Sequence, residues 1–312
     1  MSLVQVFLFG KFQVRAGQRI LDGFDALKVQ ELFCYLLLHR DHPHPREALA
    51  DLLWSDSQAD RPNRCLRKAL WQLRAALDSE PGLLSDRVLL VEPDWIQLNP
   101  QADLWLDVAI FEQAFNRVHG LQGRALDPEA VRALESAVGL YQGGLQESWY
   151  QDWYRYQRER FQHIYLVMLD KLMDYCEVNG SFESGLAYGA MTLSCERARE
   201  RTYRRLMRLH YMAGDRTAAL REYERCVAAL EEELGVGPAE RTVALCQQIR
   251  MDRLSKSTPE LVEAQQGSQA ALSPLLLLQH SLDQLQAALG QIQQEICQDI
   301  QTLRQTTHDQ GH

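Results

Sequence analysis

The chain has 312 residues, 46% of them hydrophobic and 24% charged, and a formal net charge of −9. At roughly 100–200 residues per domain this length favours about two domains, and the composition is ordinary for a soluble globular protein. The longest purely apolar runs, such as Leu275–Leu278, are far too short to cross a bilayer, and residues 1–10 lack the basic start of a signal peptide. We therefore expect a cytoplasmic protein with no membrane partner.

Metal, disulfide and enzymatic chemistry find little support in the sequence. The seven cysteines form no C-x-x-C pair and are odd in number, so we expect reduced, packed thiols. His42 and His44 form an H-x-H pair, but both flank prolines, and a plain turn is favoured over a metal site. No P-loop, G-x-G-x-x-G, G-x-S-x-G or H-E-x-x-H motif occurs. We expect no catalytic residues, no metal, no cofactor and no enzymatic activity.

Residues 1–99 are predicted to form an α+β domain of the winged helix-turn-helix type. Alternating apolar residues over 4–14 predict a short β-meander. Apolar residues at helical spacing then predict a helix over 26–38 and, after the proline-rich break at 42–45, a short helix over 46–54. A sheet followed by two helices is consistent with the beginning of this fold.

A third helix and a terminal hairpin complete the predicted domain. The helix extends to about Leu77, and Pro62 suits its first turn because the nitrogen there needs no partner. Val88–Val91 and Trp95–Leu98 are predicted strands on either side of the turn Glu92–Asp94. Three helices followed by a hairpin are typical of a winged helix.

The third helix has one apolar and one cationic face on an ideal helical wheel. No acidic residue occurs between Arg61 and Leu77, although acidic residues outnumber basic ones by 42 to 33 in the chain. Cations on one exposed face attract phosphate, and the recognition helix of such a fold reads base edges in the major groove. The predicted apolar face comprises Leu66, Ala69, Leu70, Leu73, Ala76 and Leu77. The predicted DNA-binding residues of this helix are Arg61, Asn63, Arg64, Arg67, Lys68, Trp71, Gln72 and Arg74.

Two alternatives remain open for this face. A cationic stripe is also common as the solvated side of an ordinary amphipathic helix, and only its place as the third helix favours DNA. Trp71 suits either contact with a thymine methyl group or packing against the wing. Near the wing, Arg87 is a further predicted phosphate contact, whereas Glu92 and Asp94 would repel DNA. We therefore expect the wing to contribute little minor-groove contact.

Residues 104–252 are predicted to form an all-α, tetratricopeptide-like helical-repeat domain. Gly180 and Gly214 are 34 residues apart, and each opens a turn between helical segments. A small residue follows five positions later in both cases, at Gly185 and Ala219, where it lets the next helix approach closely. That period and chemistry are typical of helical hairpins that bury their apolar faces only against neighbouring repeats.

Two side-chain groups in this domain suit binding but are better explained by the fold. An aromatic run at helical spacing predicts a helix–helix core rather than a pocket for a flat ligand. The three acidic residues Glu231–Glu233 predict a solvated helix face rather than a carboxylate site. The aromatic run comprises Trp149, Tyr150, Trp153, Tyr154, Tyr156, Phe161 and Tyr165.

The C-terminal part is predicted to be a linker followed by a coiled coil. Residues 253–273 are rich in Ser, Gln, Ala and Thr, which is typical of a linker. Residues 274–306 carry apolar residues at alternating spacings of three and four, which predict an oligomerisation helix. We expect self-association through this helix, because its e positions are uncharged glutamines that give no partner selectivity. The predicted oligomerisation residues are Leu275, Leu278, Leu282, Leu285, Leu289, Ile292 and Ile296.

Residues 1–252 resemble the SARP-type transcriptional activators, in which a winged helix precedes a bacterial transcriptional activator domain. The N-terminal likeness lies in R-E-A-L-A-D-L-L-W at 46–54 and L-R-K-A-L-W-Q-L-R-A-A-L at 66–77. The second part of the likeness includes A-L-R-E-Y-E-R at 219–225 and closes with E-E-L-G-V-G-P at 232–238. The long helix running into this last motif is the most specific piece.

The resemblance implies a DNA-binding activator that occupies repeated promoter sites and contacts RNA polymerase. It also implies that the helical domain aids dimerisation or regulation. The acidic wing turn at 92–94 departs from the family pattern, no ATPase domain follows, and the coiled-coil tail is not part of the shared pattern. The alternative is a helical-repeat adaptor that binds protein partners and recognises no specific DNA sequence.

Overall fold

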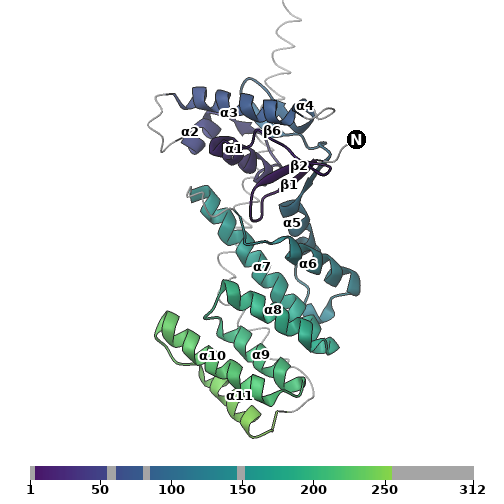
Figure 1. Cartoon of the computed structure of the whole chain (residues 1–312), viewed down its shortest axis with the longest axis vertical. Coiled ribbons are helices and arrows are strands. Elements are labelled where there is room, and N and C mark those ends of the chain that lie inside the picture. The colour runs from purple at the N-terminus through teal and green to yellow at the C-terminus, as the bar shows by residue number, and fades with distance from the viewer. Residues whose placement is uncertain (1–3, 55–60, 80–84, 146–151, 255–312) are drawn as a thin grey trace, which may run out of the picture. The chain divides into compact units, whose positions relative to one another are not determined.

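The computed structural model describes residues 4–54, 61–79, 85–145 and 152–254 (Figure 1). The predicted linker at 253–273, apart from its first two residues, lies outside these ranges. So do the predicted coiled coil at 274–306, with all its oligomerisation residues, and Trp149 and Tyr150 of the aromatic run. The predictions for these segments therefore stay predictions.

The N-terminal sheet has the strand order β3-β2-β1-β7. β1 (Val4–Phe7), β2 (Gln13–Ala16) and β3 (Arg19–Ile20) form the predicted antiparallel meander. β7 (Leu104–Leu106) lies parallel to β1 on its other side. The all-α prediction for 104–252 is wrong at β7. A strand of three residues is too short to show a period, and its partner lies far away in the sequence.

Three helices and a second sheet follow the meander in the predicted order. α1 (Leu27–Leu38) and α2 (Arg46–Trp54) match the predicted helices to within one residue, and α3 spans Pro62–Leu77. In the second sheet the order is β4-β6-β5, and β5 and β6 form the predicted hairpin. These remaining elements are β4 (His44–Pro45), α4 (Ser85–Val88), β5 (Leu89–Val91) and β6 (Trp95–Leu98).

The rest of the described chain is helical after β7. None of the helices among the described residues is both long and apolar enough to cross a membrane. Successive long helices pack on one another, α7 with α8, α8 with α9 and α9 with α10 (Figure 1). The helical elements are α5 (Asp107–Arg117), the 3-10 helix η1 (Gly123–Ala125), α6 (Pro128–Leu140), α7 (Asp152–Asn179), α8 (Phe182–Cys195), α9 (Glu200–Met212), α10 (Arg216–Leu234) and α11 (Glu240–Arg250).

Two glycines make the turns of these helical hairpins as the sequence predicts. Gly180, between α7 and α8, and Gly214, between α9 and α10, have φ of 69° and 87°, a region that favours glycine. At the first predicted close approach, a Cβ on Gly185 would lie 3.2 Å from Cys176 Cβ of α7. Ala219, the equivalent small residue of α10, is fully buried. Small side chains therefore let both hairpins close tightly.

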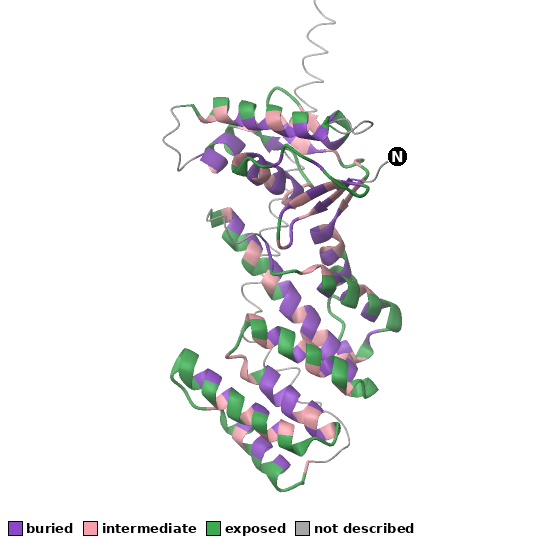
Figure 2. Ribbon diagram, in the orientation of Figure 1, coloured by how far each residue is buried: buried purple, intermediate pink, exposed green. Residues whose placement is uncertain are grey.

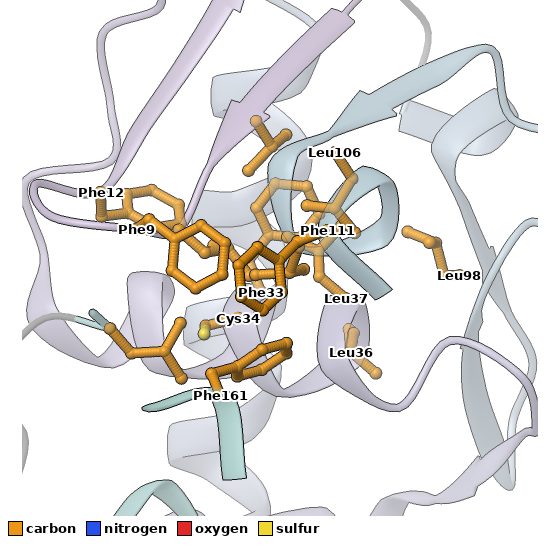
Figure 3. Close-up of a cluster of buried hydrophobic side chains, with 14 of the residues drawn as sticks. Phe9, Phe12, Phe33, Cys34, Leu36, Leu37, Leu98, Leu106, Phe111 and Phe161 are labelled. Carbon is orange, nitrogen blue, oxygen red and sulfur yellow. The ribbon is translucent and has the colours of Figure 1, made fainter. Parts of the chain in front are cut away.

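A continuous apolar core connects the N-terminal sheet with α5 and α7. The ring of Phe9, in the loop after β1, lies 5.0 Å from that of Phe111 in α5 and 5.4 Å from that of Phe161 in α7 (Figure 3). Asp107, the first residue of α5, accepts hydrogen bonds from the backbone N–H groups of Leu8 and Phe9 at 2.8 and 2.9 Å. The described aromatic residues Tyr154, Phe161 and Tyr165 are buried, which confirms the predicted core role for these three.

Candidate nucleic-acid interface

α3 is anchored by its apolar face. All six residues predicted on that face are buried, and they pack toward α1 and α2. Each of these side chains removes apolar area from water, so the rotation of α3 about its axis is fixed by the core. The wheel-based prediction of the buried face is confirmed. The buried residues are Leu66, Ala69, Leu70, Leu73, Ala76 and Leu77.

The opposite side of α3 is exposed to solvent (Figure 2). Four of its cations, Arg61, Arg64, Arg67 and Lys68, are exposed and have no ion-pair partner among the described residues. Asn63 is exposed beside them, and Gln72 is half-buried one turn further along. The side chains predicted for DNA binding at this end of α3 therefore share one accessible surface, and no described residue neutralises its positive charge.

Arg74 differs from the other cations of α3 because it is paired. Its guanidinium donates from Nη2 to Asp86 Oδ1 of α4 at 2.5 Å and from Nε to Ser85 Oγ at 3.4 Å. Asp78, just after α3, accepts the backbone N–H of Ser85 at 2.7 Å. These contacts connect the end of α3 to α4, so Arg74 has a structural partner that the sequence did not indicate.

The wing turn is shaped by Arg46, a cation that the sequence analysis did not single out. The backbone N–H of Arg46 donates to the carbonyl of Asp94 at 2.9 Å, and its guanidinium donates to the carbonyl of Glu92 at 3.2 Å. The side chains of both acidic residues are exposed, as is Arg87 in α4. Only the place of Arg46 in the sequence could have drawn attention to it, because this residue begins the helix that follows the proline-rich break.

Trp71 lies at the solvent-facing side of α3 and is 70% exposed. Its indole makes no ring contact or hydrogen bond with any residue that the structure describes. Of the two alternatives left open by the sequence, packing of Trp71 against the wing is not seen among these residues.

Near the end of α1, three histidine rings lie close together. The ring centroids of His42 and His44 are 4.3 Å apart, and that of His39 is 6.3 and 6.2 Å from them. His44 Nε2 is 2.8 Å from the carbonyl of His39, and burial lowers the pKa of both residues, that of His39 to about 4. Within the described ranges, no group of three or more His, Cys, Asp or Glu residues is arranged to hold a metal.

The described cysteines are free thiols and most are buried. Burial raises the pKa of Cys34 well above its ordinary value, and it raises that of Cys226 to about 12. A thiol with a raised pKa is a poor nucleophile because little thiolate is present near neutral pH. These two side chains therefore act as small apolar groups of the core.

Most of this chain is similar to known proteins. Residues 106–250 match the family model described as bacterial transcriptional activator domain. Two relatives, both named transcriptional regulatory protein MoaR1, are 26% identical over 258 residues, which cover 80% of this chain and 81% of the relative. They come from Mycobacterium tuberculosis (strain ATCC 25618 / H37Rv) and Mycobacterium bovis (strain BCG / Pasteur 1173P2).

A solved structure is similar in fold. The structure of Mycobacterium tuberculosis EmbR in complex with a low affinity phosphopeptide matches with a TM-score of 0.64 at 19% identity. The match covers 81% of this chain and 66% of that chain, so it spans just under two thirds of the solved protein's length. At this identity the likeness extends to the arrangement of helices and strands.

Proposed function

We propose that this chain is a SARP-type transcriptional regulator that acts by sequence-specific binding of double-stranded DNA through α3. Its match to the bacterial transcriptional activator domain and its likeness to the MoaR1 regulators support the proposal. One observation carries this proposal. Arg61, Arg64, Arg67 and Lys68 form an exposed cationic surface on a helix whose opposite face is buried. A rigid helix that presents unpaired cations is suited to a major groove, where phosphates line both sides and base edges form the floor.

Roles follow from the positions of the side chains on the helix. Arg64, Lys68 and Gln72 lie four residues apart, on successive turns of one side, and are placed to reach base edges. Arg67 lies to one side of this row, and Arg61, the N-cap of α3, precedes it; we assign both to phosphate contacts. Asn63, at the beginning of α3, adds a neutral donor and acceptor for a base or a phosphate.

We propose smaller roles for the remaining candidates. Arg87 is exposed on α4 and is placed for a phosphate contact, whereas Arg74 is held by Asp86 and positions the end of the helix. Glu92 and Asp94 repel phosphate, so the wing contributes little to affinity. The proposed phosphate contacts therefore come mainly from the first half of α3.

The family assignment extends the proposal to activation of transcription. We propose that the protein occupies repeated promoter sites and contacts RNA polymerase there, as the likeness to SARP-type activators implies. Each protomer supplies few phosphate contacts, so neighbouring sites would strengthen binding through a raised effective concentration. The predicted helix at 274–306 is our candidate for joining the protomers.

Chromatin pulldown followed by sequencing, with the full chain in its native genome, tests DNA recognition directly. A sequence motif enriched upstream of genes is the expected result. The rival adaptor function, in which the helical hairpins bind protein partners, predicts no enriched motif. Loss of the motif in a variant with Arg64, Arg67 and Lys68 replaced by alanine would assign it to α3.

A further inference from the structure

The exposed side of α3 changes character along its length. At 100° per residue, Arg64, Lys68, Trp71 and Ala75 fall within about 60° of one another and form a single row. The first two side chains of this row are cationic, and the last two are apolar and exposed. Trp71 is more exposed, at 70%, than any other large hydrophobic side chain among the described residues.

Beyond Lys68, the C-terminal part of this row has no further free cation of α3. Arg74 is the cation nearest to Trp71 in this half of the helix, and its guanidinium is held by Asp86 and Ser85. This part of α3 therefore offers no free guanidinium or ammonium group to a phosphate or a guanine. The C5-methyl group of thymine is the apolar group that the floor of a major groove displays, and it suits an indole and a methyl side chain.

We infer that α3 reads a two-part half-site, in which Trp71 and Ala75 contact the methyl groups of one or two thymines. Arg64 and Lys68 contact a purine-containing step at the other end of the same half-site. Seven residues separate Arg64 from Trp71, which is a rise of about 10 Å along the helix. At about 3.4 Å per base pair, the thymine lies about three base pairs from the base that Arg64 contacts.

This inference rests on the proposed function and fixes the chemistry of its ligand. The alternative is that Trp71 inserts into an apolar pocket on a protein partner. The position of Trp71 in a row with two unpaired cations favours DNA, because a surface that is strongly cationic on the same helix face complements phosphate.

The experiment is a selection from a random-sequence duplex library with the full-length protein and with Trp71→Ala. Wild-type protein is expected to enrich a motif that contains purine and thymine positions about three base pairs apart. Trp71→Ala is expected to keep the purine preference and lose the thymine preference. Ile20→Ala, which removes an exposed apolar side chain from β3, serves as the matched control and should select the wild-type motif.

A second measurement removes the methyl group from the DNA rather than the indole from the protein. In the selected duplex, deoxyuridine replaces thymidine at the predicted position, and affinity is measured by fluorescence anisotropy. Loss of one buried methyl contact is expected to weaken wild-type binding about fourfold and to leave Trp71→Ala unaffected. An unchanged thymine preference in Trp71→Ala, or equal sensitivity of both proteins to deoxyuridine, would overturn the inference.

The two proposals fail in different ways. If wild-type protein enriches no motif at all, DNA recognition by this chain is wrong, and the thymine contact falls with it. If wild type and Trp71→Ala enrich the same motif, DNA recognition stands and only the thymine contact is wrong. A Trp71→Ala variant that loses a protein partner while keeping the full motif would assign the indole to that partner and also overturn the inference.

Discussion

The guanidinium of Arg74 in α3 lies 2.5 Å from the carboxylate of Asp86 in α4. This ion pair separates the cations of α3 into two groups. Arg61, Arg64 and their neighbours are exposed without an ion-pair partner among the described residues, whereas Arg74 is already neutralised. The number of cations that α3 leaves free for the proposed phosphate contacts is therefore set by a contact with a neighbouring element as well as by its own sequence.

Releasing Arg74 should strengthen DNA binding. In Asp86→Asn the carboxylate charge is lost while Asp78 still accepts the backbone N–H of Ser85, so α4 stays attached to α3. We expect tighter binding and a plot of log K against log salt that is steeper by about 0.9. Titrations at several salt concentrations measure this slope. Glu129→Gln, which releases Arg117 in the helical region, is the control and should leave the slope at its wild-type value. If Asp86→Asn also has the wild-type slope, Arg74 does not reach phosphate.

The four cations of α3 that have no ion-pair partner among the described residues give a defined salt dependence. Counting each of these cations as neutralising one phosphate charge, whether it contacts a phosphate or a base edge beside it, we expect a slope of about −3.5 per protomer for the wild type. Replacing Arg64, Arg67 and Lys68 by alanine should reduce the slope to about −1 and weaken binding at least about 100-fold. Because these side chains are exposed, the thermal unfolding midpoint should barely change.

A matched control removes the same charge from exposed positions outside α3. Arg132, Arg201 and Arg221 are exposed residues of the helical region, and their triple replacement by alanine should leave DNA affinity close to wild type. Equal losses in the two triple variants would mean that net charge, rather than the surface of α3, determines binding.

Glu112 of α5 is expected to stabilise the fold. Its carboxylate lies 2.6 Å from Arg40, just after α1, and 2.8 Å from Arg160 of α7, and its side chain is only 15% exposed. Glu112→Ala leaves two guanidinium groups facing each other without their shared partner. We expect a loss of about 2 kcal/mol in the free energy of unfolding, measured with urea. Glu129→Ala breaks an exposed ion pair with Arg117 and should change stability little, which serves as the comparison.

Asp107 should make stability depend on pH in an unusual direction. Burial raises its pKa from 3.8 to about 6, although three backbone N–H groups donate to it. Between pH 4 and 6 the folded state therefore binds more protons than the unfolded state, so the contribution of Asp107 to stability falls as pH rises through this window. His39 has the opposite effect on stability. Its pKa is lowered from 6.5 to about 4, so its contribution to the free energy of unfolding is lost as pH falls through that range.

Comparison with Asp107→Asn isolates the carboxyl group from the histidines. The free energy of unfolding of the wild type, minus that of the variant, should decrease from pH 4 to pH 6 and be constant above it. A difference that does not vary over this range would show that the pKa of Asp107 in the folded protein is close to its value in the unfolded chain.

The predicted coiled coil is tested by shortening the chain. Light scattering of a protein that ends at Arg253 should give a smaller mass than the full chain, because the heptad positions at 274–306 are removed. Equal masses would assign any self-association to the part of the chain before residue 254.

The sequence predicted α3 well because all the information it needs is local. Apolar residues at helical spacing define its buried face, and Pro62 marks its first turn, so both the bounds and the exposed surface follow from the pattern. The turns at Gly180 and Gly214 were predictable for the same reason, since a left-handed backbone conformation favours glycine.

Contacts between distant segments were not predictable from local patterns. β7 pairs with β1, which lies about one hundred residues earlier in the chain, and Asp107 accepts hydrogen bonds from the backbone N–H groups of Leu8 and Phe9. Neither pairing leaves a period in the sequence. The partner of Arg74 was missed because Asp86 lies beyond the end of the helix, where helical spacing no longer indicates which side chains meet.

The attachment of β7 and Asp107 to the first strand has a consequence for modularity. A fragment that ends at residue 99 would lack the edge partner of β1, the acceptor for the N–H groups of Leu8 and Phe9, and the aromatic rings around Phe9. An open strand edge beside an uncovered phenyl ring favours aggregation. The N-terminal region that holds α3 is thus not an independent module. A fragment designed to test the proposed DNA binding must include β7 and the beginning of α5.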